Sequence, residues 1–129
     1  MKKIFLSLLL VSVSLFAEIN FIDDYEEGVA RAQKENKMIM LVFTGANCHV
    51  CNMMKADVFP DKEIAAYVNK NFVAIELDVE MDDKQGFDVF GTPTFYFLDS
   101  SAKKTIEVKV GGSNVMGFMK KLHQVVEKK

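Results

Sequence analysis

The pattern of apolar and polar residues predicts two buried strands near the middle of the chain. The run Met38–Phe43 is entirely apolar and is bounded by polar Lys37 and by Thr44-Gly45. A short continuous apolar run between polar or turn residues is typical of a strand buried on both faces of a sheet. Residues 72–79 alternate apolar and acidic side chains, which indicates a second strand. A helical segment separates the two strands, so we expect them to be parallel.

Apolar side chains at helical spacing predict four helical segments along the chain. They are expected at residues 25–36, 50–58, 61–69 and 115–127. Short polar side chains that can accept hydrogen bonds from the first backbone N–H groups precede three of these segments. The expected caps are Asp23 or Asp24, Asp61, and Ser113 or Asn114.

The second half of the chain predicts a β-hairpin. Thr94–Asp99 is a strongly aromatic strand, residues 100–104 form a turn, and residues 105–110 alternate apolar and charged side chains. A short alternation at residues 18–22 indicates an edge strand, and the acidic segment 81–90 is expected to be a loop with a short helical turn. A parallel half joined to an antiparallel half predicts an α/β fold, in which helices flank a mixed central sheet.

The first 17 residues differ from the rest and predict a secretory signal peptide, residues 1–17. Two lysines precede the apolar run Ile4–Phe16, and Ala17 marks the expected cut, which leaves one domain over residues 18–129. The apolar run is shorter than the roughly 20 residues of a membrane span. Signal-peptide cleavage favours a small residue at the third position before the cut, and Leu15 at this position is not small. An uncleaved anchor is therefore the alternative. The sequence thus predicts a periplasmic or otherwise exported protein.

The charge balance of the expected mature chain gives no sign of nucleic-acid binding. Without the two N-terminal lysines, 14 basic residues stand against 18 acidic residues, a net charge near −4. Proteins that bind nucleic acid carry basic surfaces instead. We therefore expect protein partners and no nucleic acid.

Both cysteines of the chain, Cys48 and Cys51, stand in a Cys-x-x-Cys motif directly after the apolar run 38–43. At the start of a helix, free backbone N–H groups and the helix dipole favour the Cys48 thiolate by roughly 0.3–1 kcal/mol. This is less than one pKa unit, which corresponds to about 1.36 kcal/mol, so the Cys51 thiol, His49 and solvation must supply any further activation. His49 is otherwise an exposed spacer residue.

Three kinds of chemistry suit this pair of cysteines. A structural disulfide fits an exported protein, but its loop is so short that it adds little stability. A reversible redox disulfide needs no cofactor and no metal. Soft-metal binding is the alternative, because Cys48, His49 and Cys51 could hold copper or zinc in a metal-binding module or in a cytochrome or metal-site maturation factor.

The order of the elements, with Cys-x-x-Cys after a buried strand and Thr92-Pro93 before the hairpin, resembles the thioredoxin superfamily over residues 19–127. The segment Cys48–Lys55 and the strand around Leu77 most resemble exported thioredoxin-like proteins. One such protein is the C-terminal thioredoxin-like domain of the membrane-spanning periplasmic thiol:disulfide interchange reductase. The resemblance implies a thioredoxin fold and a thiol–disulfide oxidoreductase.

The resemblance also implies roles for individual residues. Cys48 matches the exposed nucleophile and Cys51 the resolving cysteine. Pro93 matches the cis proline that faces the disulfide, and the backbone of Thr92 pairs with an extended substrate segment. A protonated His49 would stabilise the reduced form. The implied partners are client proteins with disulfides or thiols and a redox donor or acceptor, for which a membrane-embedded protein is a candidate; the nearest resemblance favours the reducing direction.

Two positions depart from the family pattern. Asn47 stands where the family usually has Trp, and the chain contains no Trp. Val42 stands six positions before Cys48, where the family often has a buried Asp that accepts the proton of the second thiol. Deprotonation of Cys51 must therefore use water or another group.

Overall fold

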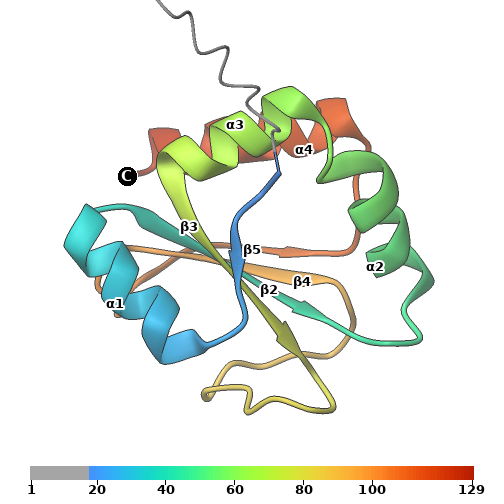
Figure 1. Ribbon diagram of the computed structural model, residues 1–129, viewed down its shortest axis with the longest axis horizontal. Coiled ribbons are helices and arrows are strands. Elements are labelled where there is room, and N and C mark those ends of the chain that lie inside the picture. The colour runs from blue at the N-terminus through green and yellow to red at the C-terminus, as the bar shows by residue number, and fades with distance from the viewer. Residues whose placement is uncertain (1–17) are drawn as a thin grey trace, which may run out of the picture.

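The computed structural model describes residues 18–129, in which five strands form one mixed sheet with helices on both faces (Figure 1). The strand order is β1-β3-β2-β4-β5. In chain order the elements are β1 (Phe21–Ile22), α1 (Tyr25–Glu35), β2 (Met38–Thr44), α2 (His49–Met53), η1 (Met54–Val58), α3 (Lys62–Asn71), β3 (Phe72–Asp78), β4 (Thr94–Leu98), β5 (Thr105–Val110) and α4 (Val115–Glu127). The expected signal peptide, residues 1–17, lies outside the described residues.

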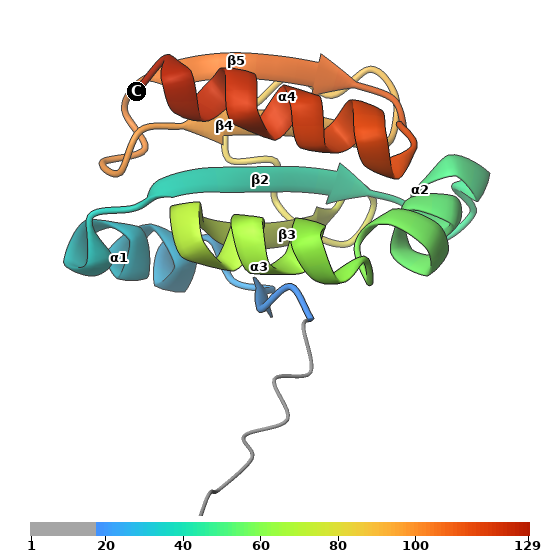
Figure 2. The same ribbon diagram turned by 90° about the horizontal axis from the view of Figure 1, so that it is seen from above.

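The middle strand β2 explains why the sheet is mixed. It runs parallel to β3, with Val42 opposite Glu76, and antiparallel to β4, with Val42 opposite Phe95. All seven residues of β2 are buried. The predicted α/β fold, the buried strand and its parallel partner are therefore confirmed. Figure 2 shows β2 leading directly to α2 at one end of the sheet.

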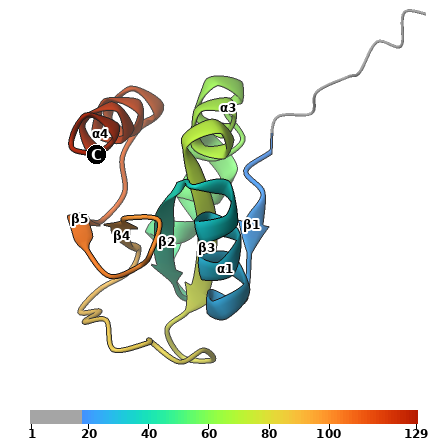
Figure 3. The same cartoon turned by 90° about the vertical axis from the view of Figure 1, so that its left-hand side faces the viewer.

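The two faces of the sheet bury separate apolar cores, because successive side chains of a strand point to opposite faces. Met40 and Val42 lie in the core that α3, α4 and η1 cover, together with Phe118 of α4. Leu41 lies in the opposite core, against Ala32 of α1. Figures 1 and 3 show α3 and α4 on one side of the sheet and α1 on the other.

Helix starts follow the predicted caps. Asp24 accepts a hydrogen bond from the Glu27 backbone N–H at 2.8 Å, and Asn114 accepts one from Gly117 at 2.8 Å. Asp61 accepts from two backbone N–H groups of α3, each at 3.0 Å. Such caps contribute about 1 kcal/mol each. The helices α1 and α4 therefore begin where the sequence predicts, and α3 begins one residue later than expected, directly after its predicted cap Asp61.

Two predicted segments differ in the structure. The helix expected at residues 50–58 begins one residue earlier and changes into the π-helix η1, because the Phe59 N–H bonds the Met54 carbonyl oxygen five residues back, at 2.8 Å. Residues 81–90 form the expected loop, but its helical turn is reduced to isolated hydrogen-bonded turns, such as the one that the Asp82 N–H closes on the Asp78 carbonyl oxygen at 2.9 Å. No helix within residues 18–129 is long and apolar enough to cross a bilayer.

Candidate active site

The two cysteines lie at the end of β2, where the chain turns into α2. Cys48 is the N-cap of α2, and a disulfide joins it to Cys51, with 5.2 Å between the Cα atoms. Cys48 is half-buried, whereas Cys51 is only 1% exposed. Cys48 is therefore the more accessible of the two cysteines.

The first turn of α2 is arranged to favour negative charge on Cys48. The backbone N–H of Cys51 donates a hydrogen bond to Cys48 Sγ at 3.1 Å. Hydrogen bonds to a charged group are worth about 1.5–3 kcal/mol, so this bond favours the thiolate once the disulfide is reduced. His49 is exposed at the start of α2.

The Thr92-Pro93 segment lies against the disulfide. The peptide bond between the two residues is cis, as the family resemblance implied, and Pro93 is buried. The carbonyl oxygen of Thr92 lies 3.4 Å from Cys48 Sγ. The Pro93 carbonyl accepts a hydrogen bond from the Gly111 N–H at 2.8 Å, which ties this segment to the loop after β5. The structure thus brings together the motifs around residues 48 and 92, which lie 44 positions apart.

Exposed apolar side chains occur in the segments that carry the site. Phe90, two residues before Thr92, is 96% exposed, and Val50 inside the cysteine motif is 38% exposed. Gly112 lies against Val50 and Met53, and a Cβ built on it would come within 2.6 Å of the Val50 side chain. Sequence reasoning missed Gly112, because its place beside α2 depends on contacts between distant segments. It also missed the exposure of Phe90.

The aromatic strand β4 belongs to the core. Phe95 and Phe97 have no exposed surface, and Tyr96 packs against Phe43 while its hydroxyl donates to the Asp88 carbonyl at 2.7 Å. The three aromatic side chains of β4 therefore lie in or against the two cores.

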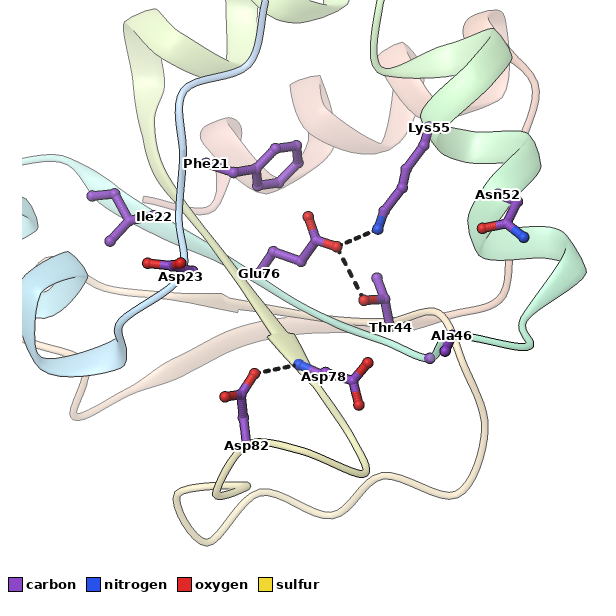
Figure 4. A pocket seen from close by; sticks show the side chains of 11 residues that line it. Phe21, Ile22, Asp23, Thr44, Ala46, Asn52, Lys55, Glu76, Asp78 and Asp82 are labelled. Carbon is purple, nitrogen blue, oxygen red and sulfur yellow. Dashed lines mark hydrogen bonds and ion pairs between the residues drawn. The ribbon is translucent and has the colours of Figure 1, made fainter.

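A polar cluster lies beside α2 on the same face of the sheet as Val42. Glu76 Oε1 accepts a hydrogen bond from Thr44 Oγ1 at 3.1 Å and pairs with Lys55 Nζ at 2.5 Å (Figure 4). These three residues, Asn52 and Asp78 line an open cavity of about 300 Å³. Val42 itself is completely buried. Sequence reasoning missed Glu76, because its neighbours depend on the register of β3 against β2 and on the reach of Lys55 from η1.

The arrangement of donor side chains gives the metal alternative no support. Within residues 18–129, no three His, Cys, Asp or Glu side chains converge as metal ligands. His49 therefore does not complete a ligand set with the two cysteines. The geometry instead fits reversible thiol–disulfide exchange, with a half-buried first cysteine, a buried second cysteine and a neighbouring cis-proline segment.

The mixed sheet, the Cys48–Cys51 disulfide at the start of α2 and the cis Thr92-Pro93 bond define a thioredoxin-fold protein with a thiol–disulfide oxidoreductase site. A family model described as thioredoxin-like matches residues 20–100, and the chain belongs to this family.

Similar proteins agree with this assignment. The thiol:disulfide interchange protein DsbD of Pseudoalteromonas atlantica is 26% identical over 110 residues, which cover 81% of this chain but 18% of that protein. Spermatogenesis-associated protein 20 of Rattus norvegicus is 40% identical over 55 residues, which cover 43% of this chain and 7% of that protein. The chain thus spans a small part of both relatives. The solution structure of a thioredoxin from Thermus thermophilus has a TM-score of 0.75 and 28% identity, with 84% of this chain and 87% of that one covered.

Proposed function

We propose that this protein is an exported thiol–disulfide oxidoreductase that reduces disulfides in client proteins. The observation that carries the proposal is the asymmetry of the disulfide. Cys48 is half-buried and accepts a backbone hydrogen bond, Cys51 is buried, and the Thr92 carbonyl lies beside the reactive sulfur.

The proposed cycle uses both cysteines in turn. In the reduced protein, the Cys48 thiolate attacks one sulfur of a client disulfide, and the other client sulfur leaves as a thiolate. The Cys51 thiolate then attacks Cys48 Sγ, breaks the mixed disulfide and releases the second client thiolate. Two electrons pass to the client, and Cys48–Cys51 becomes the disulfide. A redox donor, for which a membrane-embedded protein is a candidate, returns the pair to two thiols.

The neighbouring segment is proposed to hold the client. The backbone of Thr92 can pair with an extended client strand, as sheet edges bind peptides, while Pro93 fixes the segment beside the disulfide. His49, exposed next to the reactive sulfur, modulates the stability of the thiolate through its charge. No cofactor takes part in these steps.

Export is proposed from the sequence of residues 1–17, which carries two lysines, an apolar run and Ala17. The similarity to a thiol:disulfide interchange protein supports a role in disulfide exchange. The reducing direction is supported by the weak stabilisation of the Cys48 thiolate. Among the described residues, this stabilisation comes from a single backbone hydrogen bond and from the exposed His49. Strongly oxidising relatives of this fold stabilise the reduced form much more.

The equilibrium reduction potential of the purified, metal-free protein tests the direction. The two thiols would be followed by alkylation and mass measurement across a series of dithiothreitol or glutathione buffers. A value near the thioredoxin end, about −270 mV, supports the reductase. A value near about −120 mV would make the protein a disulfide donor. Absence of a reversible two-electron transition would overturn the redox function.

A further inference from the structure

The proposed cycle needs a group that accepts a proton from Cys51. Only the thiolate attacks a disulfide, and Cys51 becomes a thiol when the pair is reduced. Because Cys51 is 1% exposed, bulk water has little access to its sulfur. Val42, on the strand beneath α2, offers no atom that could take the proton.

The register of the sheet places a carboxylate next to Val42. In the parallel pair of β2 and β3, Glu76 lies opposite Val42, so the two side chains point to the same face of the sheet. The active-site helix and its continuation η1 cover this face, and Lys55 of η1 reaches down to Glu76. Figure 4 shows the Glu76 carboxylate between Thr44 of β2 and Lys55.

Two contacts orient the carboxylate and leave room for a proton. Thr44 Oγ1 and Lys55 Nζ both contact Oε1 of Glu76, at 3.1 and 2.5 Å. Within the described residues, no hydrogen bond or ion pair engages Oε2, and only 25% of the side chain is exposed. The second oxygen is therefore the one that can take up a proton.

A cavity extends from Glu76 to residues that flank the two cysteines in the sequence. Its volume is about 300 Å³, enough for several waters at about 30 Å³ each. Gly45 and Ala46, which precede Cys48, and Asn52, which follows Cys51, line it together with Glu76 and Lys55. Water in this cavity can carry a proton between the active-site turn and the carboxylate.

Two other carboxylates that face the same cavity serve other contacts. Asp82 accepts a hydrogen bond from the Asp78 N–H, and Asp78 accepts from the backbone N–H groups of the turn that follows β3. Asp23, from the turn after β1, also lines the cavity. Among these carboxylates, Glu76 is the one that the described contacts tie to the active-site helix.

We propose that Glu76, oriented by Thr44 and Lys55, accepts the proton of Cys51 through water when the mixed disulfide is resolved. This inference rests on the proposed function. The Cys51 S–H bond breaks and its proton passes to Glu76. The thiolate electron pair forms the bond to Cys48 Sγ, the mixed disulfide breaks, and the client sulfur leaves as a thiolate. Glu76 afterwards returns its proton to solvent through the cavity.

The test follows the two chemical steps separately in the full-length reduced protein. A symmetric aromatic disulfide whose thiolate absorbs visible light is mixed with the protein in a stopped-flow instrument. The first thiolate is released by Cys48 at a rate proportional to disulfide concentration. The second is released by Cys51 at a rate independent of that concentration. The variant Glu76→Gln keeps the shape of the side chain but not its charge, and Glu76→Asp keeps the carboxylate. The matched control is Glu63→Gln, which removes an exposed charge of α3.

A positioned proton acceptor typically increases the rate of a step about 10²–10⁴-fold, and transfer through water lowers this gain. Glu76→Gln should therefore slow the second step about tenfold near neutral pH. The rate of the first step should change by less than about twofold. In alkaline solution, where hydroxide deprotonates Cys51, the second-step rates of Glu76→Gln and the wild type should become equal. Glu76→Asp should keep most of the rate, and Glu63→Gln all of it.

Three results would contradict parts of this account. A Glu76→Gln protein with the second-step rate and pH profile of the wild type would overturn the role of Glu76. Equal slowing of both steps, or equal slowing in Glu76→Asp, would show a structural role instead. A wild-type protein that releases only one thiolate would overturn the proposed function itself, whatever the variant does.

Discussion

Replacing Phe90 with Ser tests whether this exposed apolar side chain, two residues before Thr92, binds clients. Phe90 is 96% exposed, so its removal takes almost nothing from the folded core. Full burial of a Phe side chain is worth about 1.5–3 kcal/mol. A client segment beside Thr92 would cover one side of the ring, so we expect a loss of roughly 1 kcal/mol, or about fivefold in binding.

The assay compares a disulfide-bonded protein client with a small aromatic disulfide. For the protein client, KM should rise about fivefold with kcat unchanged, because the contact is the same in the bound and transition states. For the small disulfide neither constant should change. Phe90→Leu keeps an apolar side chain and should retain most of the affinity. Equal kinetics of wild type and Phe90→Ser on the protein client, or equal losses on both substrates, would refute the assignment of a client-binding role.

Two further predictions concern the stability of the scaffold. Phe118→Ala removes a fully buried ring from the core between α4 and the sheet and should cost about 3–5 kcal/mol, measured by urea denaturation; a loss below about 1 kcal/mol would contradict the packing. Hydrogen bonds from Lys128 and Lys121 hold the pKa of Glu107 below its ordinary value of 4.5. The contacts of Glu107 with these two lysines therefore stabilise the fold above pH 4.5, and this contribution is lost as the pH falls through the lowered pKa. Glu107→Gln should lower the free energy of unfolding by about 1 kcal/mol near neutral pH and flatten its decline between about pH 5 and 3, and an unchanged pH dependence would contradict this.

Local patterns were enough to predict most of the fold. The apolar run Met38–Phe43 and the alternation of residues 72–79 became β2 and β3, and α4 has the predicted bounds, Val115–Glu127. These elements are long for their type, and polar caps or turns bound them. The π-helix η1 was not predictable, because a single hydrogen bond that reaches one residue further back leaves no mark in the apolar pattern.

The reactive pair was evident from the sequence, but its surroundings were not. The Cys-x-x-Cys spacing identified Cys48 and Cys51, because both lie on one local turn. Glu76 is different. Its neighbours are set by the register of β2 against β3 and by the reach of Lys55 from η1. The exposure of Phe90 likewise depends on the path of residues 81–90, a segment without helix or strand.

The most direct test of the central claim is to trap the mixed disulfide with single-cysteine variants. Reduced Cys51→Ala protein, incubated with a disulfide-bonded client, should accumulate a covalent adduct through Cys48, seen by mass spectrometry and reversed by dithiothreitol. Reduced Cys48→Ala protein should accumulate little, because Cys51 is buried. Adduct formation at Cys51 in preference to Cys48, or at neither residue, would contradict a cycle in which Cys48 attacks and Cys51 resolves.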